Sequence, residues 1–301
     1  MKASGKTIEP APLRIAHRGG GGWRPENTLA AFRHAIETGC DGAELDVQLS
    51  SDGRIVAYHN ARLNHHLCRS ADGTWLQPDD IIPIGSTAFD ELRSYEVGMP
   101  NPGTDYHLRF NRLVAVPGER IPTLDEVIAL AQARSETFRL IIEIKSDVSA
   151  AASQPWLPLV ERVVALVKAT GFAKRTIFCA FDWGAMIHAK SLLPEVPVWF
   201  TSHTLENQGH ARLLNRLQQE GVVKWLPARK RIWFDAKTPA RIRDLGGDGW
   251  FVHHSNCTRR LVQRIRSAGL TSAAWSVNLT DEREVARVLS SGVNAICSDY
   301  P

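Results

Sequence analysis

The sequence predicts an α/β fold, and within that class a (β/α)8 TIM barrel. Short apolar runs of strand length alternate along the chain with segments of helical periodicity, and eight core strands can be counted. Removing the irregular segment 60–120 from the 301 residues leaves 240, close to the roughly 250 of a typical barrel. An open doubly wound sheet is disfavoured, because no Gly-x-Gly-x-x-Gly follows a predicted strand and the run 19–22 lacks that spacing.

The chain begins its regular structure with a strand over 13–16, a helix over 27–38 and a second strand over 42–47. Asn27 is the expected N-cap of the helix, and Gly39 suits the left-handed position that follows a helix end. Because a strand, a helix and a second strand form a βαβ unit, the order favours a parallel sheet.

A further apolar run predicts a strand over 55–59. The next segment, 60–120, is rich in Pro, Gly, Asp and Asn, and it predicts an irregular insertion with at most one short helix, around 89–95. Long loops in compact domains are usually functional covers or disordered. We therefore expect one barrel domain over 1–301 with an insertion subdomain over 60–120 inside it.

Regular alternation resumes at Thr123, where Thr-x-x-Glu with Glu126 is a capping box that starts a helix to about Arg134. The segment 232–234 is an ambiguous extra strand. The remaining strands are expected at 140–145, 176–181, 196–201, 249–253, 272–277 and 294–298, and the remaining helices at 157–170, 183–193, 205–219, 258–268 and 281–290.

Composition limits the function classes. Lys plus Arg number 36 against 32 Asp plus Glu, so the net charge of +4 suits an anionic small molecule and does not indicate nucleic-acid binding. No run of about 18 apolar residues predicts a membrane span. The five cysteines are widely spaced and lack C-x-x-C pairs, which is typical of reduced thiols, and the polar N-terminus favours a cytoplasmic protein. The sequence leaves the oligomeric state open.

Two pairs of charged residues share the inner face of predicted neighbouring strands. Glu44 and Asp46 are two positions apart on one strand, and Glu143 and Lys145 are two apart on another, so each pair points to one side. Three convergent carboxylates repel one another and require cations. Hard oxygen ligands suit Mg²⁺ or Ca²⁺ better than zinc.

Histidines flank these acids in the sequence. His17 and Arg18 follow the first strand, and His59 ends another, so all are expected at the barrel rim where such enzymes place their sites. Taken alone, His17 is more often a hydrogen-bonded structural residue, and an isolated Glu-x-Asp or Glu-x-Lys is usually a solvated face or an ion pair. Their joint position favours a site for divalent-metal and anion chemistry.

Together the motifs resemble the glycerophosphodiester phosphodiesterase family. The blocks that carry the resemblance follow in order from residue 14 to 301: His17-Arg18-Gly19, Pro25-Glu26-Asn27-Thr28, Glu44-Leu45-Asp46-Val47, His59, Ile121-Pro122-Thr123-Leu124, Glu143-Ile144-Lys145, Trp275-Ser276-Val277-Asn278 and Ser298-Asp299-Tyr300-Pro301. The resemblance implies a barrel that hydrolyses glycerophosphodiesters to glycerol 3-phosphate and an alcohol with one divalent cation. It also permits attack by the substrate's own glycerol hydroxyl through a cyclic phosphate.

Carried over position by position, the resemblance implies a role for each matched residue. The metal would be held by Glu44, Asp46 and Glu143, the general acid and base would be His17 and His59, and the phosphate would be bound by Arg18 and Lys145. Glu26 and Asn27 would support the site or cap the first helix. Trp275 would either pack on the glycerol or the leaving alcohol, or lie in the core.

One position departs from the family pattern. An aspartate usually follows the second histidine, and here Asn60 stands in its place, so the amide supplies no carboxylate charge to His59. This difference leaves open a catalytically silent phosphodiester-binding barrel. The barrel and the two-histidine arrangement leave open a second alternative, a lipid phosphodiesterase similar to sphingomyelinase D. Possible contacts from the insertion to the alcohol are His65, His66, Arg69, Tyr106, His107 and Arg109.

Overall fold

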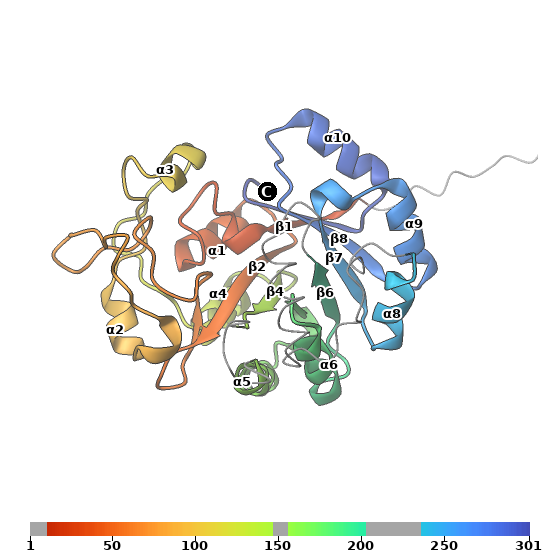
Figure 1. The fold of residues 1–301 in the computed structure, drawn as a ribbon, viewed down its shortest axis with the longest axis horizontal. Helices are drawn as coiled ribbons and strands as arrows, with labels where there is room; N and C mark the ends of the chain where they lie inside the picture. Colours follow the sequence, from red (N-terminus) through yellow and green to blue (C-terminus); the bar gives the residue numbers. More distant parts are fainter. Residues whose placement is uncertain (1–10, 147–155, 203–235) are drawn as a thin grey trace, which may run out of the picture.

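A computed structural model of the protein describes residues 11–146, 156–202 and 236–301, which form a closed barrel of parallel strands with helices outside it (Figure 1). The ring closes because β1 pairs with β2 on one side and β9 on the other. The eight barrel strands are β1 (Leu13–Ala16), β2 (Gly42–Leu49), β4 (Arg139–Ile144), β5 (Thr176–Ala180), β6 (Val198–Ser202), β7 (Gly249–His253), β8 (Thr271–Trp275) and β9 (Ala295–Ser298). The predicted TIM barrel is confirmed.

Helices cover the outside of the ring. They are α1 (Leu29–Glu37), α4 (Leu124–Arg134), α5 (Leu157–Ala169), α6 (Trp183–Leu192), α8 (Thr238–Asp244), α9 (Arg259–Ser267) and α10 (Glu282–Ser291). The seven-residue α8 was not expected from the sequence, because its roughly two turns carry too short an apolar pattern. The expected helix over 205–219 and the ambiguous strand over 232–234 lie outside the described residues.

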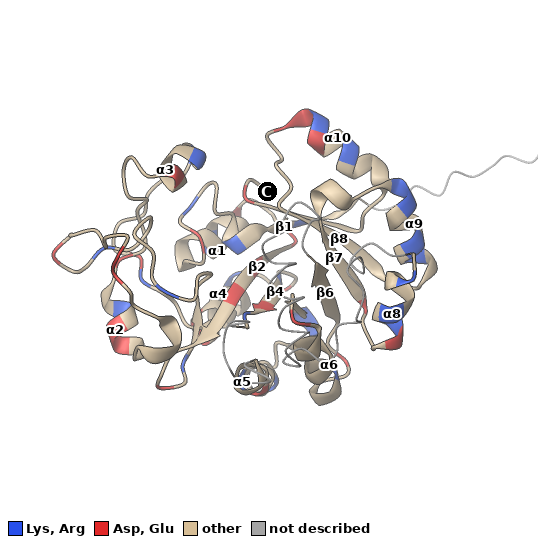
Figure 2. Ribbon diagram, in the orientation of Figure 1, with Lys and Arg blue, Asp and Glu red and all other residues tan. Residues whose placement is uncertain are grey.

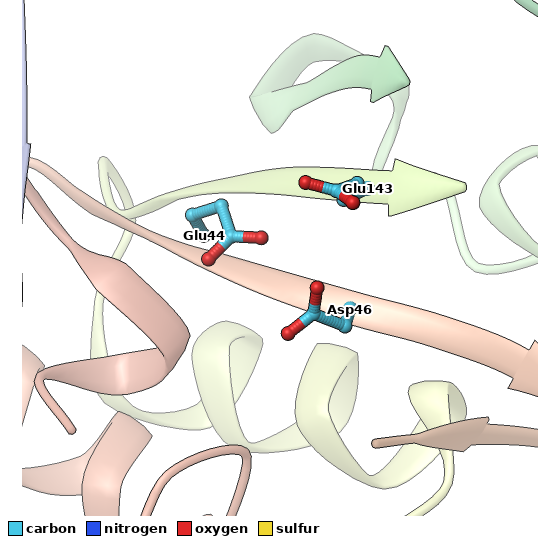
Figure 3. A group of neighbouring side chains, drawn as sticks. All are labelled: Glu44, Asp46 and Glu143. Carbon is cyan, nitrogen blue, oxygen red and sulfur yellow. The ribbon is translucent and has the colours of Figure 1, made fainter. Parts of the chain in front are cut away.

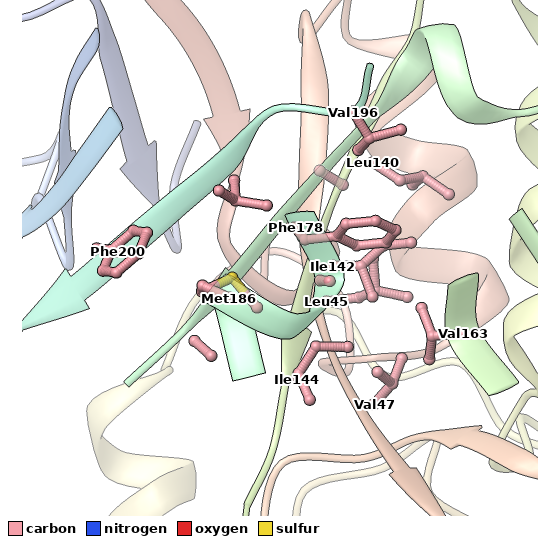
Figure 4. Close-up of a cluster of buried hydrophobic side chains, with 14 of the residues drawn as sticks. Leu45, Val47, Leu140, Ile142, Ile144, Val163, Phe178, Met186, Val196 and Phe200 are labelled. Atoms are coloured by element: carbon pink, nitrogen blue, oxygen red, sulfur yellow. The ribbon is translucent and has the colours of Figure 1, made fainter. Parts of the chain in front are cut away.

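The strands alternate between two environments, as the sequence predicts. Leu45 and Val47 of β2 and Ile142 and Ile144 of β4 point outward and pack, with Val163 of α5, in the main hydrophobic core (Figure 4). Burial of each such side chain stabilises the fold by about 1.5–3 kcal/mol. The intervening residues of both strands face the barrel interior, which brings the acidic side chains to one place.

The first helix starts one residue later than the sequence predicts. Thr28 is the N-cap of α1, and its hydroxyl accepts a hydrogen bond from the Ala31 N–H at 3.2 Å. Asn27, the expected cap, adopts a left-handed backbone with φ 55° and turns its side chain toward β2. Gly39 has the left-handed backbone that was expected, with φ 71°. The predicted capping box of Thr123 and Glu126 is present at the start of α4.

The strand predicted at 55–59 is shorter and is not part of the ring. β3 (Ile55–Ala57) pairs antiparallel with the end of β2, where Val47 faces Ala57. The connection is too short for the crossover that parallel strands need, so the chain folds back on itself. As a result β3 runs toward the barrel mouth from outside it and delivers His59 beside Asp46.

The segment after β3 has a small hydrophobic core of its own. It contains α2 (Phe89–Ser94), as expected, and also α3 (Asp105–Arg109), a second helix that the sequence did not indicate because five residues show no periodicity. Figure 1 shows the segment packed beside α1 and β2, with α3 at its outer end. None of the helices in the described ranges is long and apolar enough to cross a membrane.

Charged residues lie both outside and inside the ring. Figure 2 shows Lys and Arg along α9, charges of both signs on α8 and α10, and acidic residues on the strands β2 and β4 inside the ring. Solvent screens the outer charges, but those inside the barrel must be balanced by neighbouring groups. All five cysteines are buried and free, as expected.

Candidate active site

A cavity of about 590 Å³ opens at the carboxyl ends of the barrel strands. Charged residues line the side of the cavity formed by β1, β2 and β4. Three aromatic residues, Phe181, Phe251 and Trp275, line the opposite side. The insertion contributes a third group: His66, Asp105, Tyr106, Arg109 and Phe110. The cavity therefore combines a polar floor, an aromatic wall and a cover.

Three buried carboxylates meet at the floor of the cavity. Figure 3 shows Glu44 and Asp46 on β2 and Glu143 on the neighbouring β4, with their carboxylates turned to the same side. One oxygen of each lies within 4.8 Å of the others. The strand register explains the closeness, because Asp46 and Glu143 are directly paired across the two strands. The side-chain alternation predicted from sequence therefore places all three together.

The carboxylates are unequally compensated. Burial would raise the pKa of Asp46, but the charges of Lys145, His59 and Arg18 hold it far below its usual range. Burial and the neighbouring Asp46 charge instead raise the pKa of Glu44 to about 8. Two permanent cations thus face three acids.

Glu44 also keeps one buried oxygen without a hydrogen bond. Its Oε1 has no partner among the described residues, whereas Oε2 accepts the Arg18 backbone N–H at 3.0 Å. A cluster of hard oxygen ligands that leaves a negative charge and a lone oxygen uncompensated fits a divalent cation. The three residues could therefore hold one.

Two cationic side chains lie against the acids. The Nζ of Lys145 is 2.8 Å from Glu143 Oε1 and 3.2 Å from Asp46 Oδ1. The guanidinium of Arg18 is 3.0 Å from Glu26 through Nη1 and 3.4 Å from Asp46 through Nε. Both cations also line the cavity, so both can reach an anion bound there.

His17 is held by a carboxylate from the other end of the chain. Its Nδ1 donates a hydrogen bond to Asp299 Oδ1 at 2.6 Å, and its Nε2 lies 3.8 Å from Glu44 Oε2. Burial alone would lower the pKa of His17, but the Asp299 charge and hydrogen bond raise it. The ring is therefore oriented with Nε2 toward the acidic group.

His59 has an amide as its partner. Its Nδ1 is 2.6 Å from Asn60 Oδ1, which as an amide oxygen can only accept, so Nδ1 carries the proton. Burial lowers the pKa of His59, and the charges of Arg18 and Lys145 add to that effect against the opposing Asp46. The second ring nitrogen is left without the proton and available to accept one.

Residues 17–301 match the glycerophosphoryl diester phosphodiesterase family. The chain belongs to this family. Its activity class is therefore phosphodiester hydrolysis. Among curated relatives, a glycerophosphodiester phosphodiesterase of Caldanaerobacter subterraneus is 27% identical over 292 residues, covering 96% of this chain and 94% of that protein.

Solved structures agree with this assignment. A candidate glycerophosphoryl diester phosphodiesterase from Silicibacter pomeroyi has a TM-score of 0.84 at 27% identity, with 97% of this chain and 91% of that chain covered. An Oleispira antarctica phosphodiesterase, solved in complex with the product sn-glycerol-3-phosphate, has a TM-score of 0.66 at 24% identity, with coverages of 97% and 94%. At that identity the second likeness shows the shared barrel fold.

The residues that the family resemblance singled out converge in this phosphodiesterase. The cavity is lined by His17, Arg18, Glu26, Glu44, Asp46, His59, Glu143, Lys145 and Trp275. Asn27 lies beneath it, donating to Asp46 Oδ2 at 2.9 Å. Trp275 packs edge-on against Phe181 with ring centroids 5.7 Å apart, and it both lines the cavity and packs against the hydrophobic cluster inside the barrel.

The sequence pattern assigned no particular role to Asp299, although it lies in the last of the blocks that carry the family resemblance, Ser298 to Pro301. Its signal was its position directly after β9, at the same rim as the other strand ends. The aromatic wall was also missed at Phe181 and Phe251. Of the insertion residues named as possible contacts, His66, Tyr106 and Arg109 line the cavity.

Proposed function

We propose that this phosphodiesterase hydrolyses glycerophosphodiesters to sn-glycerol 3-phosphate and an alcohol, with one Mg²⁺ or Ca²⁺ held by Glu44, Asp46 and Glu143. The observation that carries the proposal is the buried group of three carboxylates flanked by two histidines and two cations in one cavity. The Oleispira antarctica phosphodiesterase of the same fold holds the product named here.

The phosphate of the substrate would bind between Arg18 and Lys145. Both cations line the cavity and both keep their charge at neutral pH, because neighbouring carboxylates raise their pKa values against the effect of burial. When bound at the three carboxylates, a divalent cation would polarise the phosphoryl oxygens and offset their charge. Trp275 would pack against the glycerol or the alcohol from the aromatic wall.

Proton transfer would be carried out by His17 and His59. Hydrolysis needs one proton removed from the attacking oxygen and one delivered to the leaving alcohol, and each transfer requires a group within hydrogen-bond reach. Hydrogen bonds at Nδ1 fix both rings, so that Nε2 would be the nitrogen of each ring that exchanges a proton with the substrate. The attacking oxygen would come from water or from the glycerol hydroxyl of the substrate itself.

The direct test is release of glycerol 3-phosphate from glycerophosphocholine by the purified protein with Mg²⁺ or Ca²⁺ added. We expect release with the cation, loss of it with a chelator, and no release by His17→Ala. His34→Ala, on the outside of α1, is the matched control and should keep wild-type activity. No release by the wild type with several glycerophosphodiesters and both metals would leave the silent binding barrel as the better description.

Glu44→Gln tests the metal site with a readout besides activity. The change keeps the side-chain shape but removes the charge, so calorimetric affinity for Mg²⁺ should fall at least about tenfold and turnover by orders of magnitude. Glu37→Gln, at an exposed position at the end of α1, is the control. Unchanged cation affinity would remove Glu44 from the metal site.

The aromatic wall favours a second candidate, cleavage of a lipid such as a lysophospholipid. Phe181, Phe251 and Trp275 present an apolar surface opposite the charged floor, and an acyl chain could lie on it. Comparing kcat/KM for lysophosphatidylcholine and glycerophosphocholine separates the two substrates. We expect the water-soluble diester to be preferred, and a higher kcat/KM for the lipid would establish the second candidate.

We also propose the cytoplasm as the compartment, because all five cysteines are unpaired and suit a reducing environment. Fractionation of the native cells, followed by immunodetection, tests this. Recovery in a secreted or periplasmic fraction would exclude it.

A further inference from the structure

We propose that Tyr106, on the insertion helix α3, is a positioning residue of the active site that acts through Glu26 on Arg18. The proposal rests on the proposed function, because Arg18 is assigned there to the phosphate of the substrate. It connects the cover of the cavity to the phosphate-binding floor.

A continuous chain of hydrogen bonds links the three residues. The Tyr106 hydroxyl donates to Glu26 Oε2 at 3.0 Å, across 80 positions of sequence. The other carboxylate oxygen, Glu26 Oε1, accepts from Arg18 Nη1 at 3.0 Å. Because the two bonds hold opposite oxygens, the plane of the carboxylate is set from both sides. Without the hydroxyl, Glu26 could rotate about its last side-chain bonds.

The conformation of Arg18 depends on the contacts around it. Its backbone is left-handed, with φ 51° and ψ 34°, a conformation that non-glycine residues adopt only where surrounding contacts impose it. Its guanidinium lies between Glu26 and Asp46, with Nε 3.4 Å from Asp46 Oδ2. If Glu26 moved away, Asp46 would attract the guanidinium toward the acidic group and away from the phosphate position.

Tyr106 is suited to act only as a donor. Burial and the charge of Glu26 raise its pKa well above the ordinary value, so the hydroxyl keeps its proton. Its ring packs against Phe110 with centroids 4.7 Å apart, and a phenylalanine at position 106 would keep this contact. Tyr106→Phe therefore removes one hydrogen bond and little else.

The competing explanation is that the hydroxyl merely fastens the insertion to the barrel. In that case its loss would lower the melting temperature and leave the binding of anions beside Arg18 unchanged. If Tyr106 acts through Glu26, the two changes must be coupled, because removing the carboxylate also removes what the hydroxyl positions.

Calorimetric binding of sn-glycerol 3-phosphate and of inorganic phosphate, with Mg²⁺ present, measures this without turnover. We expect Tyr106→Phe to weaken binding of both anions about fivefold, the effect of one lost hydrogen bond, with a similar fall in kcat/KM. Glu26→Gln should weaken binding more. Adding Tyr106→Phe to Glu26→Gln should change nothing further. Tyr95→Phe, in the same insertion but outside the cavity, is the matched control and should bind like the wild type.

Three results would overturn the proposal: unchanged binding in Tyr106→Phe, additive losses in the double variant, or a loss of binding matched by Tyr95→Phe. If the variants show the expected losses of anion binding but the wild type does not hydrolyse glycerophosphodiesters, the role of Tyr106 is supported and the proposed function is overturned. Failure of the wild type to bind either anion would overturn both.

Discussion

The two histidines of the cavity have the same geometry and different partners. His17 and His59 each place Nδ1 2.6 Å from an oxygen, but the first oxygen belongs to the carboxylate of Asp299 and the second to the amide of Asn60. The pKa of His17 is raised, because the charge and hydrogen bond of Asp299, together with the charge of Glu44, outweigh burial. The pKa of His59 is lowered, mainly by burial. Hydrogen bonds of equal length therefore orient the two rings, while the charge of the partner makes their pKa values differ.

The backbones that carry them also differ. His17 begins a tight turn directly after β1, followed by the left-handed Arg18. His59 follows the antiparallel β3, and the Gln48 side chain of β2 donates to the carbonyls on both sides of it, those of Tyr58 and Asn60, at 2.7 and 2.8 Å. One histidine is thus held by a barrel strand end, and the other by a hairpin and a single amide.

Removal of each imidazole gives the largest expected effect. His17→Ala and His59→Ala should each lower kcat by about 10²–10⁴-fold, because each removes a proton-transfer group. Steady-state hydrolysis of glycerophosphocholine measures both. A loss below about tenfold for either one would show that only one side of the cavity transfers protons.

Asp299→Asn makes the two settings alike, since both histidines then have amide partners. We expect kcat to fall about 10- to 100-fold, because the amide orients the ring without stabilising its charged form. Thermal melting should change little, as the hydrogen bond can be retained. A wild-type kcat would mean that the charge of Asp299 is not used.

Asn60→Asp gives His59 the partner that the family usually has. Turnover should rise, by at most about tenfold, if a carboxylate charge helps the second histidine. The double variant Asp299→Asn/Asn60→Asp then shows which histidine benefits more from the charge. Unchanged turnover in the single variant would make position 60 a spectator in this protein.

Gln48→Ala tests the support of the weaker side and should have the smallest effect. Loss of two hydrogen bonds should lower the melting temperature by a few degrees, since each contributes about 1 kcal/mol. We expect kcat to fall only a few-fold, since the Asn60 bond still orients the ring. Calorimetric melting and the same hydrolysis assay measure these effects, and a kcat loss as large as that of His59→Ala would contradict the ranking.

Short-range sequence patterns determined most of the secondary structure and the direction of the acidic side chains. The eight strands, most helices, the capping box at Thr123 and the inward side of Glu44, Asp46 and Glu143 follow from alternation and turn chemistry that act over a few residues. One departure has a tertiary cause: Thr28 and not Asn27 caps the first helix, because the side chain of Asn27 bonds to Asp46 on the neighbouring strand β2.

Only the tertiary structure decided which side chains His17 and Tyr106 contact. The bond from His17 to Asp299 spans 282 positions and exists because β1 and β9 are neighbours once the ring closes. Tyr106 reaches Glu26 across 80 positions because the insertion packs beside α1. Periodicity reports which side of an element is buried, but not which distant element covers it. Such contacts form only when the ring is closed. For that reason the sequence indicated the three acids that could hold a metal, with Glu26 and Asn60 beside them, and gave no role to Asp299 and no particular partner to Tyr106.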